Sequence, residues 1–201
     1  MTEGQQDSST CVSNACNLLV TTGEQENRQM RFKDTHDVVV ISESDAHKLI
    51  AAARPHWRLP LRILYLYGMR ASELLGLSSN NFRDGIFVLQ RTKRGELTRQ
   101  AIHPAIKEDL YALMKTKLPG ALLFPYSRIS LYRQMQEAGH RAGVDPAYCH
   151  PHSFRHCAGR RWAKIGTPYQ VQAMLGHKTL AMALLYGRLA CDEDMSRKFL
   201  E

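Results

Sequence analysis

The sequence lacks any long apolar run. No stretch approaches the ~18 consecutive apolar residues of a membrane-spanning helix, and the N-terminus lacks the basic and then apolar pattern of a secretory signal. Cysteines are few and odd in number, and no two of them have C-x-x-C spacing: Cys11, Cys16, Cys149, Cys157 and Cys191. We therefore expect a cytoplasmic protein with free thiols, no membrane contact and no disulfide framework.

Acidic side chains are outnumbered by basic ones. The 201 residues include 27 Lys and Arg against 19 Asp and Glu, a formal net charge of +8. Residues 1–36 hold three basic and five acidic side chains, so residues 37–201 hold 24 and 14, a net charge of +10. A basic body of this kind favours a polyanionic partner such as nucleic acid. Many basic proteins bind nothing acidic, however, so the charge alone does not decide the function.

Composition divides the chain into two parts near residue 37. Residues 1–36 are rich in Gln, Ser, Thr and Asn and show little periodicity, which predicts a largely disordered arm. Residues 37–201 predict one α+β domain that is mostly helical, with a small antiparallel hairpin. Apolar residues recur at helical spacing in residues 42–53, 60–75 with a break at Gly68, 104–118, 127–143, 152–166, 167–177 and 180–190. Two β-like runs, residues 85–91 and 96–104, flank the hairpin turn "TKRG".

Local signals support several of these helices. Ser42 and Asp45 have the spacing of a capping box at a helix N-terminus. Pro104 suits the first position of another helix. One helical face, at i, i+4, i+8 and i+11, is expected to pack in the core: Phe154, Ala158, Trp162 and Ile165.

The stretch "HPHSFRH", residues 150–156, holds three histidines and one arginine and allows three interpretations. His152 and His156 have the spacing of a zincin metal site, but Ser153 stands where the catalytic Glu of that motif belongs. His152 and Arg155 are neighbours on a helix surface, where a guanidinium and the N–H groups of a helix start suit a phosphate oxygen. The plainest alternative is a solvated helix face with a capping histidine. This stretch alone does not decide among them.

Three further segments carry residues that suit the same phosphate. Arg70 lies in "GMRASELLGL", three residues before Glu73, and Lys93 lies in the predicted hairpin turn. "LGH" ends at His177, and Tyr186 follows nine residues later. With the H-x-x-R of the histidine-rich stretch, these motifs resemble those of the tyrosine recombinase (phage integrase) family. That family has, in this order, R-x-S-E-L, a Lys on a β-hairpin, H-x-x-R, L-G-H and a Tyr nine residues after that His.

The resemblance covers roughly residues 40–195 and implies a phosphoryl transfer without hydrolysis. In the family, a tyrosine hydroxyl attacks a DNA phosphodiester and leaves a 3′-phosphotyrosine bond and a free 5′-hydroxyl. A 5′-hydroxyl of another strand then reverses the step. No metal and no cofactor is implied, because the protein–DNA ester keeps the bond energy. The catalytic residues that the resemblance implies are Arg70, Lys93, His152, Arg155, His177 and Tyr186.

Each of these residues has an implied role. Tyr186 is the nucleophile, and Lys93 protonates the leaving 5′-oxygen. Arg70 and Arg155 stabilise the charge of the transition state, because a guanidinium grips two oxygens and stays protonated. The two histidines add hydrogen bonds to the same phosphate. Glu73 is expected to pair with neighbouring cations.

Two histidines and the N-terminal region lie outside the catalytic pattern of the family. His150 and His156 match no catalytic position of the family, so they are expected to pack locally or to contact the DNA backbone. Most family members carry an additional N-terminal helical domain that closes around DNA, and this sequence has the polar arm in its place. In that layout it resembles short members such as the fimbrial phase-variation invertases. We therefore expect weaker DNA binding than that of a two-domain relative.

The implied partner is double-stranded DNA. The family also implies a homo-oligomer, a tetramer on paired sites, in which the C-terminal tail could be exchanged between subunits. The expected function is site-specific recombination by inversion, resolution or integration. The alternative is a catalytically silent DNA-binding accessory or regulatory protein with the same fold. A relative that relaxes DNA or forms hairpin ends is disfavoured by the short chain.

Overall fold

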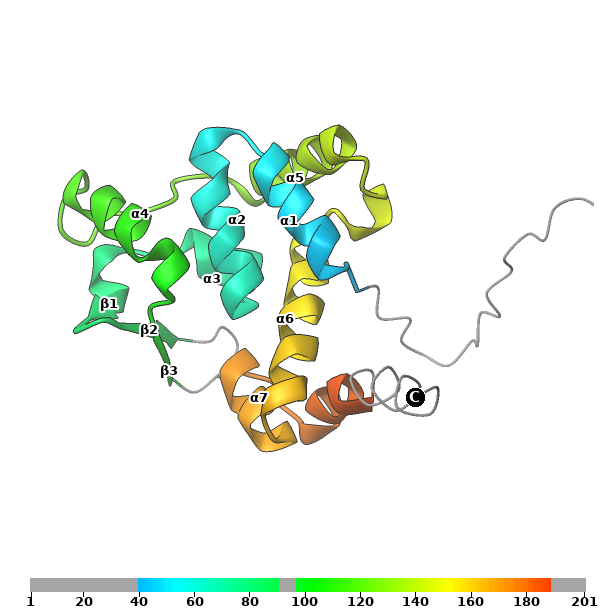
Figure 1. Cartoon of the computed structure of the whole chain (residues 1–201). Helices are drawn as coiled ribbons and strands as arrows, with labels where there is room; N and C mark the ends of the chain where they lie inside the picture. Colours follow the sequence, from blue (N-terminus) through cyan, green and yellow to red (C-terminus); the bar gives the residue numbers. More distant parts are fainter. Residues whose placement is uncertain (1–39, 91–96, 189–201) are drawn as a thin grey trace, which may run out of the picture. The chain divides into compact units, whose positions relative to one another are not determined.

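The computed structural model describes residues 40–90 and 97–188, which are mostly helical (Figure 1). The helices are α1 (Glu43–Ala52), α2 (Pro55–Tyr67), α3 (Ala71–Leu75), α4 (Pro104–Lys115), α5 (Arg128–Ala142), α6 (Pro151–Ile165) and α7 (Pro168–Leu175), with short 3-10 turns η1 (Ser79–Asn81) and η2 (Pro146–Tyr148). The chain is helical again over residues 180–188. The predicted N-terminal arm and the hairpin turn with Lys93 lie outside the described residues.

The predicted start signals of α1 and α4 are confirmed. The Ser42 hydroxyl caps α1 by accepting a hydrogen bond from the N–H of Asp45 at 3.0 Å. Pro104 is the first residue of α4. A proline is tolerated there because an N–H at this position would have no acceptor within the helix. Local polar chemistry therefore sets where these two helices begin.

The start of α2 differs from the prediction. The helix begins at Pro55, five residues before the predicted start, and contains Pro60. A proline at this position removes one helix hydrogen bond. The burial of its neighbours offsets this loss, since Trp57 is 4% exposed and Leu61 is fully buried. Tertiary packing overrides the local signal here.

The sheet has three antiparallel strands in the order β1 (Phe82–Arg83), β2 (Ile86–Gln90) and β3 (Leu97–Ala101). The predicted hairpin is confirmed, because β2 and β3 pair from Ile86↔Ala101 to Gln90↔Leu97. Strand β1 was not expected, since two residues are too few to show an alternating pattern. The expected fold, mostly helical with a small antiparallel sheet, is confirmed.

Two groups of buried side chains hold these elements together. The larger group, the main core, is centred on α2, which packs against α1, α3, α4 and α6. Leu49, Leu64, Leu131 and Phe154 are fully buried in it. The smaller group, the C-terminal cluster, lies where α6, α7 and residues 180–188 meet, and its buried members are Val171, Leu175, Ala183 and Tyr186.

Helix α6 belongs to both groups. It runs from the central helices to α7 (Figure 1). Of its predicted core-facing residues, Phe154 and Ala158 are fully buried, and Trp162 packs partly buried against the C-terminal cluster. Ile165 is 79% exposed, so the prediction is wrong at the last turn. Ile165 is the last residue of α6, next to the C-cap Gly166.

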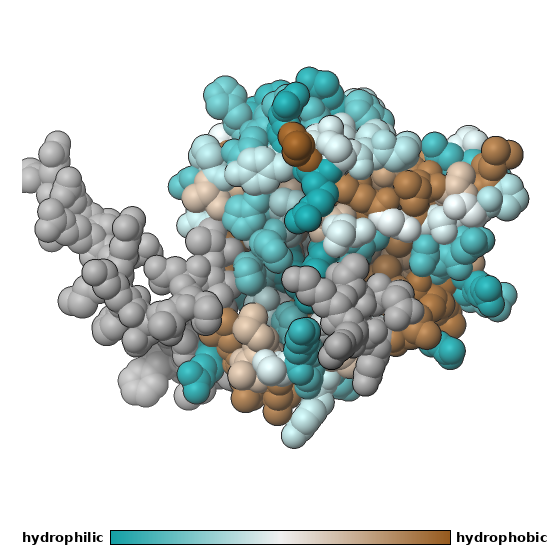
Figure 2. Space-filling view, turned by 180° about the vertical axis from the view of Figure 1, so that it is seen from behind, coloured by the Kyte–Doolittle hydropathy of each residue, from teal (hydrophilic) through white to brown (hydrophobic). Residues whose placement is uncertain are grey.

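Apolar side chains also reach the surface of the described residues. Figure 2 shows hydrophobic patches among hydrophilic residues on the face opposite to the view of Figure 1. The most exposed large apolar side chains are Leu97, Leu118, Ile129, Ile165 and Tyr169. Of the helices that the structure describes, none is both long enough and apolar enough to cross a membrane.

Candidate active site

The break between α2 and α3 presents Arg70. Gly68 ends α2 with a φ of 57°, a conformation that favours glycine. A Cβ on Gly68 would lie 2.7 Å from Leu175 and 2.9 Å from Ala158, so the end of α2 lies directly against α6 and α7. Arg70 follows in an extended conformation as the N-cap of α3.

Glu73 holds Arg70 in place. Its buried carboxylate accepts the backbone N–H of Arg70 at 2.9 Å and pairs with the guanidinium at 2.8 Å. One carboxylate thus fixes both the backbone and the side chain of the same arginine. The expectation that Glu73 pairs with a neighbouring cation is confirmed.

Helix α6 begins within the histidine-rich stretch. His150 is its N-cap, and the Nδ1 atom of His150 accepts a hydrogen bond from the N–H of Ser153 at 3.2 Å. His152 and Arg155 therefore lie in the first two turns of the helix. The interpretation of a solvated helix face fails for Arg155, which is 3% exposed.

The Arg155 guanidinium joins three elements. It donates to the carbonyl oxygen of Gly68 at 2.7 Å and to that of Leu175 at 2.6 Å. The first carbonyl belongs to the end of α2 and the second to the last turn of α7, while Arg155 itself comes from α6. The charged group is therefore held in a fixed position by backbone acceptors.

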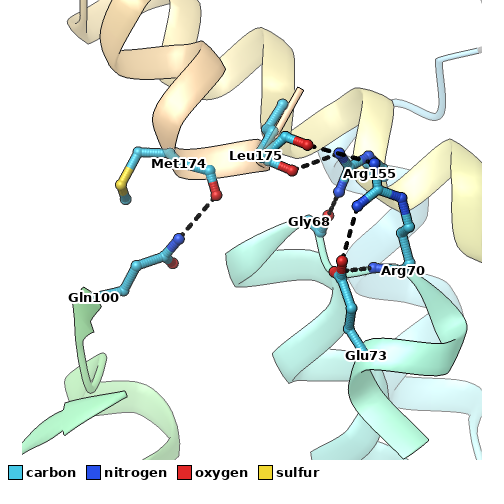
Figure 3. Close-up of polar contacts among 8 residues, drawn as sticks. Gly68, Arg70, Glu73, Gln100, Arg155, Met174 and Leu175 are labelled. Carbon is cyan, nitrogen blue, oxygen red and sulfur yellow. Dashed lines mark hydrogen bonds and ion pairs between the residues drawn. The ribbon is translucent and has the colours of Figure 1, made fainter. Parts of the chain in front are cut away.

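Three side chains, from β3, α6 and the start of α3, point to successive backbone carbonyls at the C-terminus of α7 (Figure 3). Gln100 of β3 donates to Met174 at 3.0 Å, Arg155 donates to Leu175, and Arg70 lies 3.5 Å from the carbonyl of Gly176. These carbonyls form the negative end of the helix, which favours nearby cations. The two guanidiniums thus approach the same helix end instead of separate surfaces.

A cleft of about 870 Å³ opens beside Arg70. Its lining includes residues at the starts of three helices: Arg70 and Ser72 from α3, Arg128 and Tyr132 from α5, and His150 and His152 from α6. The N-terminal N–H groups of α5 and α6 add partial positive charge to that of the guanidiniums. The cleft therefore suits an anion such as a phosphate. Arg128 was not expected to take part.

The Tyr186 phenol packs against His156 and Gly159 of α6. It is 1% exposed, and its hydroxyl lies 2.8 Å from the Nδ1 atom of His156. The ring stacks on His177 with centroids 5.6 Å apart and planes at 19°. Burial raises the pKa of Tyr186, and the nearby charge of Arg155 opposes part of that rise. The phenol is therefore protonated at neutral pH in this arrangement.

Two histidines of α6 are neutral at pH 7. Burial lowers the pKa of His152, and the charge of Arg155 lowers it further. Burial, followed by the charges of His152 and Arg155, lowers the pKa of His156 to about 4. The two rings lie 6.2 Å apart and are nearly parallel. A neutral imidazole both accepts and donates hydrogen bonds.

The structure brings five of the six predicted site residues into one neighbourhood. They are Arg70, His152, Arg155, His177 and Tyr186. Lys93 lies outside the described residues. His156 and Arg128 were missed as site residues. A signal for His156 exists in the sequence, because His152, His156 and Gly159 follow at i, i+4 and i+7 and so share one helix face.

A mostly helical domain with this fold and this set of residues is typical of the catalytic domains of tyrosine recombinases. Residues 39–192 match the family model of the phage integrase family, and the chain belongs to that family. Among curated proteins, it is similar to the tyrosine recombinase XerA of Saccharolobus solfataricus, with 27% identity over 169 residues, which is 82% of this chain and 57% of that protein. XerC of Mycobacterium bovis is 31% identical over 147 residues, 66% of this chain and 49% of that protein. The chain spans about half the length of the curated relatives that it matches.

Solved structures share the fold. A crystal structure of XerA recombinase has a TM-score of 0.68 and 20% identity, over 82% of this chain and 66% of that one. The catalytic domain of bacteriophage HP1 integrase has a TM-score of 0.61 and 21% identity, over 81% of this chain and 95% of that one. XerH recombinase bound to its palindromic difH substrate has a TM-score of 0.65 and 18% identity, over 82% and 54%. At these identities the likeness shows the fold.

Proposed function

We propose that the chain is a tyrosine-type site-specific recombinase that cuts and rejoins double-stranded DNA through a covalent 3′-phosphotyrosine intermediate. The observation that carries the proposal is the gathering of five side chains. Arg70 and Arg155 reach the C-terminal end of α7, His177 stacks on Tyr186, and His152 lies next to His156, which contacts Tyr186. These residues come from segments that are far apart in the sequence. A core without a function would not need two guanidiniums at one helix end.

The scissile phosphate binds in the cleft beside Arg70 and His152. Arg155 and Arg70 donate to its non-bridging oxygens and stabilise the additional charge of the pentavalent transition state. Glu73 and the carbonyls of Gly68 and Leu175 hold these guanidiniums before DNA arrives. Prior ordering matters because the donors then need no reorganisation during the reaction.

The Tyr186 oxygen attacks the phosphorus. The bond from this oxygen to phosphorus forms, the bond to the 5′-oxygen breaks, and the phenol proton passes to an acceptor in the site. Lys93 supplies the proton that the leaving 5′-oxygen takes up. A 5′-hydroxyl of a second strand reverses these steps, so the number of phosphodiester bonds is unchanged.

DNA is the proposed partner because the cleft is electropositive and residues 37–201 carry a net charge of +10. XerH, which shares the fold, is bound to its difH DNA. We also propose that strand exchange takes place in a tetramer on paired sites, since each exchange needs two cut duplexes. Inverted repeats in the DNA that flanks the gene are the first candidates for the target.

A nicked suicide substrate tests the proposal. When the nick lies next to the cleavage site, a short strand diffuses away and the 3′-phosphotyrosine complex accumulates. We expect a covalent protein–DNA band on a denaturing gel with the wild-type protein. Tyr186→Phe should abolish this band, because the variant has no attacking oxygen.

Tyr65→Phe is the matched control, since this tyrosine is also buried but lies in the main core. The control should retain the band. A band that persists in Tyr186→Phe would contradict the assignment of the nucleophile. Retarded DNA migration without any covalent band would instead favour the silent DNA-binding alternative.

A further inference from the structure

The Tyr186 phenol makes one specific contact that the proposed mechanism does not explain. Its hydroxyl is within 2.8 Å of the Nδ1 atom of His156, a residue that matches no catalytic position of the family. The two rings have centroids 5.8 Å apart and are tilted by 46°, so they are not stacked and the hydrogen bond is their specific contact. His177 covers another side of the phenol ring.

Gly159 makes room for this contact. A Cβ on Gly159 would lie 2.8 Å from the Cζ atom of Tyr186 and 2.9 Å from two further ring atoms. Gly159 lies inside α6 and does not have the positive φ that would require glycine. A glycine inside a helix costs about 1 kcal/mol relative to alanine. The space for the phenol accounts for a residue that the helix itself disfavours.

The surroundings of His156 determine the charge of its ring. The titratable and charged groups around its ring are His150, His152 and Arg155 on α6 and Tyr186 beyond α7. Burial, together with the charge of Arg155, keeps the imidazole neutral. A neutral imidazole has one protonated and one unprotonated nitrogen. We assign Nδ1 as the unprotonated one, so that the ring accepts and the Tyr186 hydroxyl donates.

We propose that His156 is a positioning residue for the Tyr186 nucleophile, and that His156 and Gly159 form a seat on α6 that fixes the phenol oxygen beside the cleft. The inference rests on the proposed function. His156 lies one helical turn, or about 6 Å along the axis, after His152, which lines the cleft. Because the hydroxyl proton points to Nδ1, the oxygen lone pairs are free to face away from His156.

Two substitutions of His156 separate the hydrogen bond from packing. In His156→Asn, the amide Oδ1 takes the approximate place of Nδ1 and accepts the same hydrogen bond without titrating. In His156→Phe, a ring of similar size remains but the acceptor is lost. His47→Phe is the matched control. His47 lies on α1, and the centroid of its ring is 5.0 Å from that of the buried Tyr65 on α2.

The first experiment uses the full chain without DNA. The protein carries tyrosine labelled with 13C at Cζ, and the Tyr186 signal is assigned from its loss in Tyr186→Phe. We expect His156→Phe to shift this signal, and His156→Asn and His47→Phe to leave it near its wild-type position. An unmoved signal in His156→Phe would overturn the inference, since the hydrogen bond would not exist in solution.

The second experiment measures the rate of covalent-complex formation on the nicked substrate, together with DNA affinity. We expect His156→Phe to slow the reaction about 10²-fold, the cost typical of a misplaced reacting group, with unchanged affinity. His156→Asn should recover most of the rate. An increased rate in His156→Phe would overturn the inference, because the contact with His156 would then hinder the attack of the phenol instead of positioning it. Equal loss in the two variants would overturn it too, since packing alone would explain the result.

Glycine substitutions test the seat from its other side. Gly159→Ala favours the helix but places a methyl group against the phenol, so we expect a slower reaction and a shifted Tyr186 signal. Gly187→Ala is the control, because it adds the same methyl group next to Tyr186 where nothing lies within 4 Å. Equal rates in the two variants would contradict the seat.

The two experiments separate the two proposals. If the wild-type protein forms no covalent complex but the labelled phenol responds to His156→Phe, then the proposed function fails while the hydrogen bond stands. If the covalent complex forms but His156→Phe changes neither the Tyr186 signal nor the rate of complex formation, then the recombinase proposal holds and the positioning role fails.

Discussion

The main core and the C-terminal cluster differ in size, and each supports one part of the candidate site. The main core joins buried residues from α1 to α6, and through Gly68 and α6 it fixes Arg70 and Arg155. The C-terminal cluster has four buried members, one of which is Tyr186 itself. Local opening costs less where fewer apolar contacts are lost. We therefore expect the part of the site that carries the two arginines to open at a higher cost than the segment with the phenol.

The largest expected effect comes from a leucine-to-alanine substitution made once in the main core and once in the C-terminal cluster. Leu64 in the main core and Leu175 in the C-terminal cluster are each fully buried. Leucine-to-alanine changes in protein cores cost about 2–5 kcal/mol. We expect Leu64→Ala to lower the free energy of unfolding by an amount near the upper end of this range and Leu175→Ala near the lower end. Urea denaturation followed by circular dichroism measures the two losses. A larger loss for Leu175→Ala would reverse the comparison.

Sequence patterns predicted most helices and the hairpin, because these elements carry periodic apolar residues and local caps. They failed where packing decided the outcome: Pro60 lies inside α2, and Ile165 lies outside the core. Periodicity tells which residues share a face, but it does not tell how far the opposing element extends. The extent of α2 and α6 relative to one another depends on contacts between residues far apart in the chain.

The candidate site was predictable in its residue types but not in its internal bonds. The partners of Arg155 are backbone carbonyls 87 and 20 residues away, and every residue carries such a carbonyl. No sequence pattern singles out the one that a guanidinium reaches. His156 was missed for a related reason, because its partner Tyr186 is 30 residues away and the family pattern gives that histidine no role.

The fixed part of the site is tested by Arg155→Lys. An ammonium has a single nitrogen and cannot donate to Gly68, Leu175 and a phosphate in the geometry of a guanidinium. We expect the rate of covalent-complex formation to fall about 10²–10³-fold, the usual cost of losing a transition-state donor. The nicked-substrate assay gives this rate.

Arg62→Lys is the control for charge and chain length. Arg62 forms an exposed ion pair with Asp109 on α4, which contributes at most about 1 kcal/mol. This variant should react at the wild-type rate. If Arg155→Lys also reacted at that rate, the guanidinium would be a structural link and not a stabiliser of the transition state.

The smallest expected effect concerns pH and the segment with the phenol. The pKa of His156 is lowered from 6.5 to about 4 in the folded protein. As pH falls from 6.5 towards 4, the unfolded chain takes up a proton that the folded chain does not, so this histidine makes the protein less stable over that window. His156→Asn removes the effect while keeping a hydrogen-bond acceptor, and His152, whose pKa is also lowered, stays in the two proteins. We expect the loss of stability between about pH 7.5 and about pH 5 to be smaller in the variant by about 1 kcal/mol, after allowance for partial exposure. Urea denaturation at the two pH values measures it. Equal losses would mean that the pKa of His156 is not lowered in the folded protein and that its ring takes up a proton as readily there as in the unfolded chain.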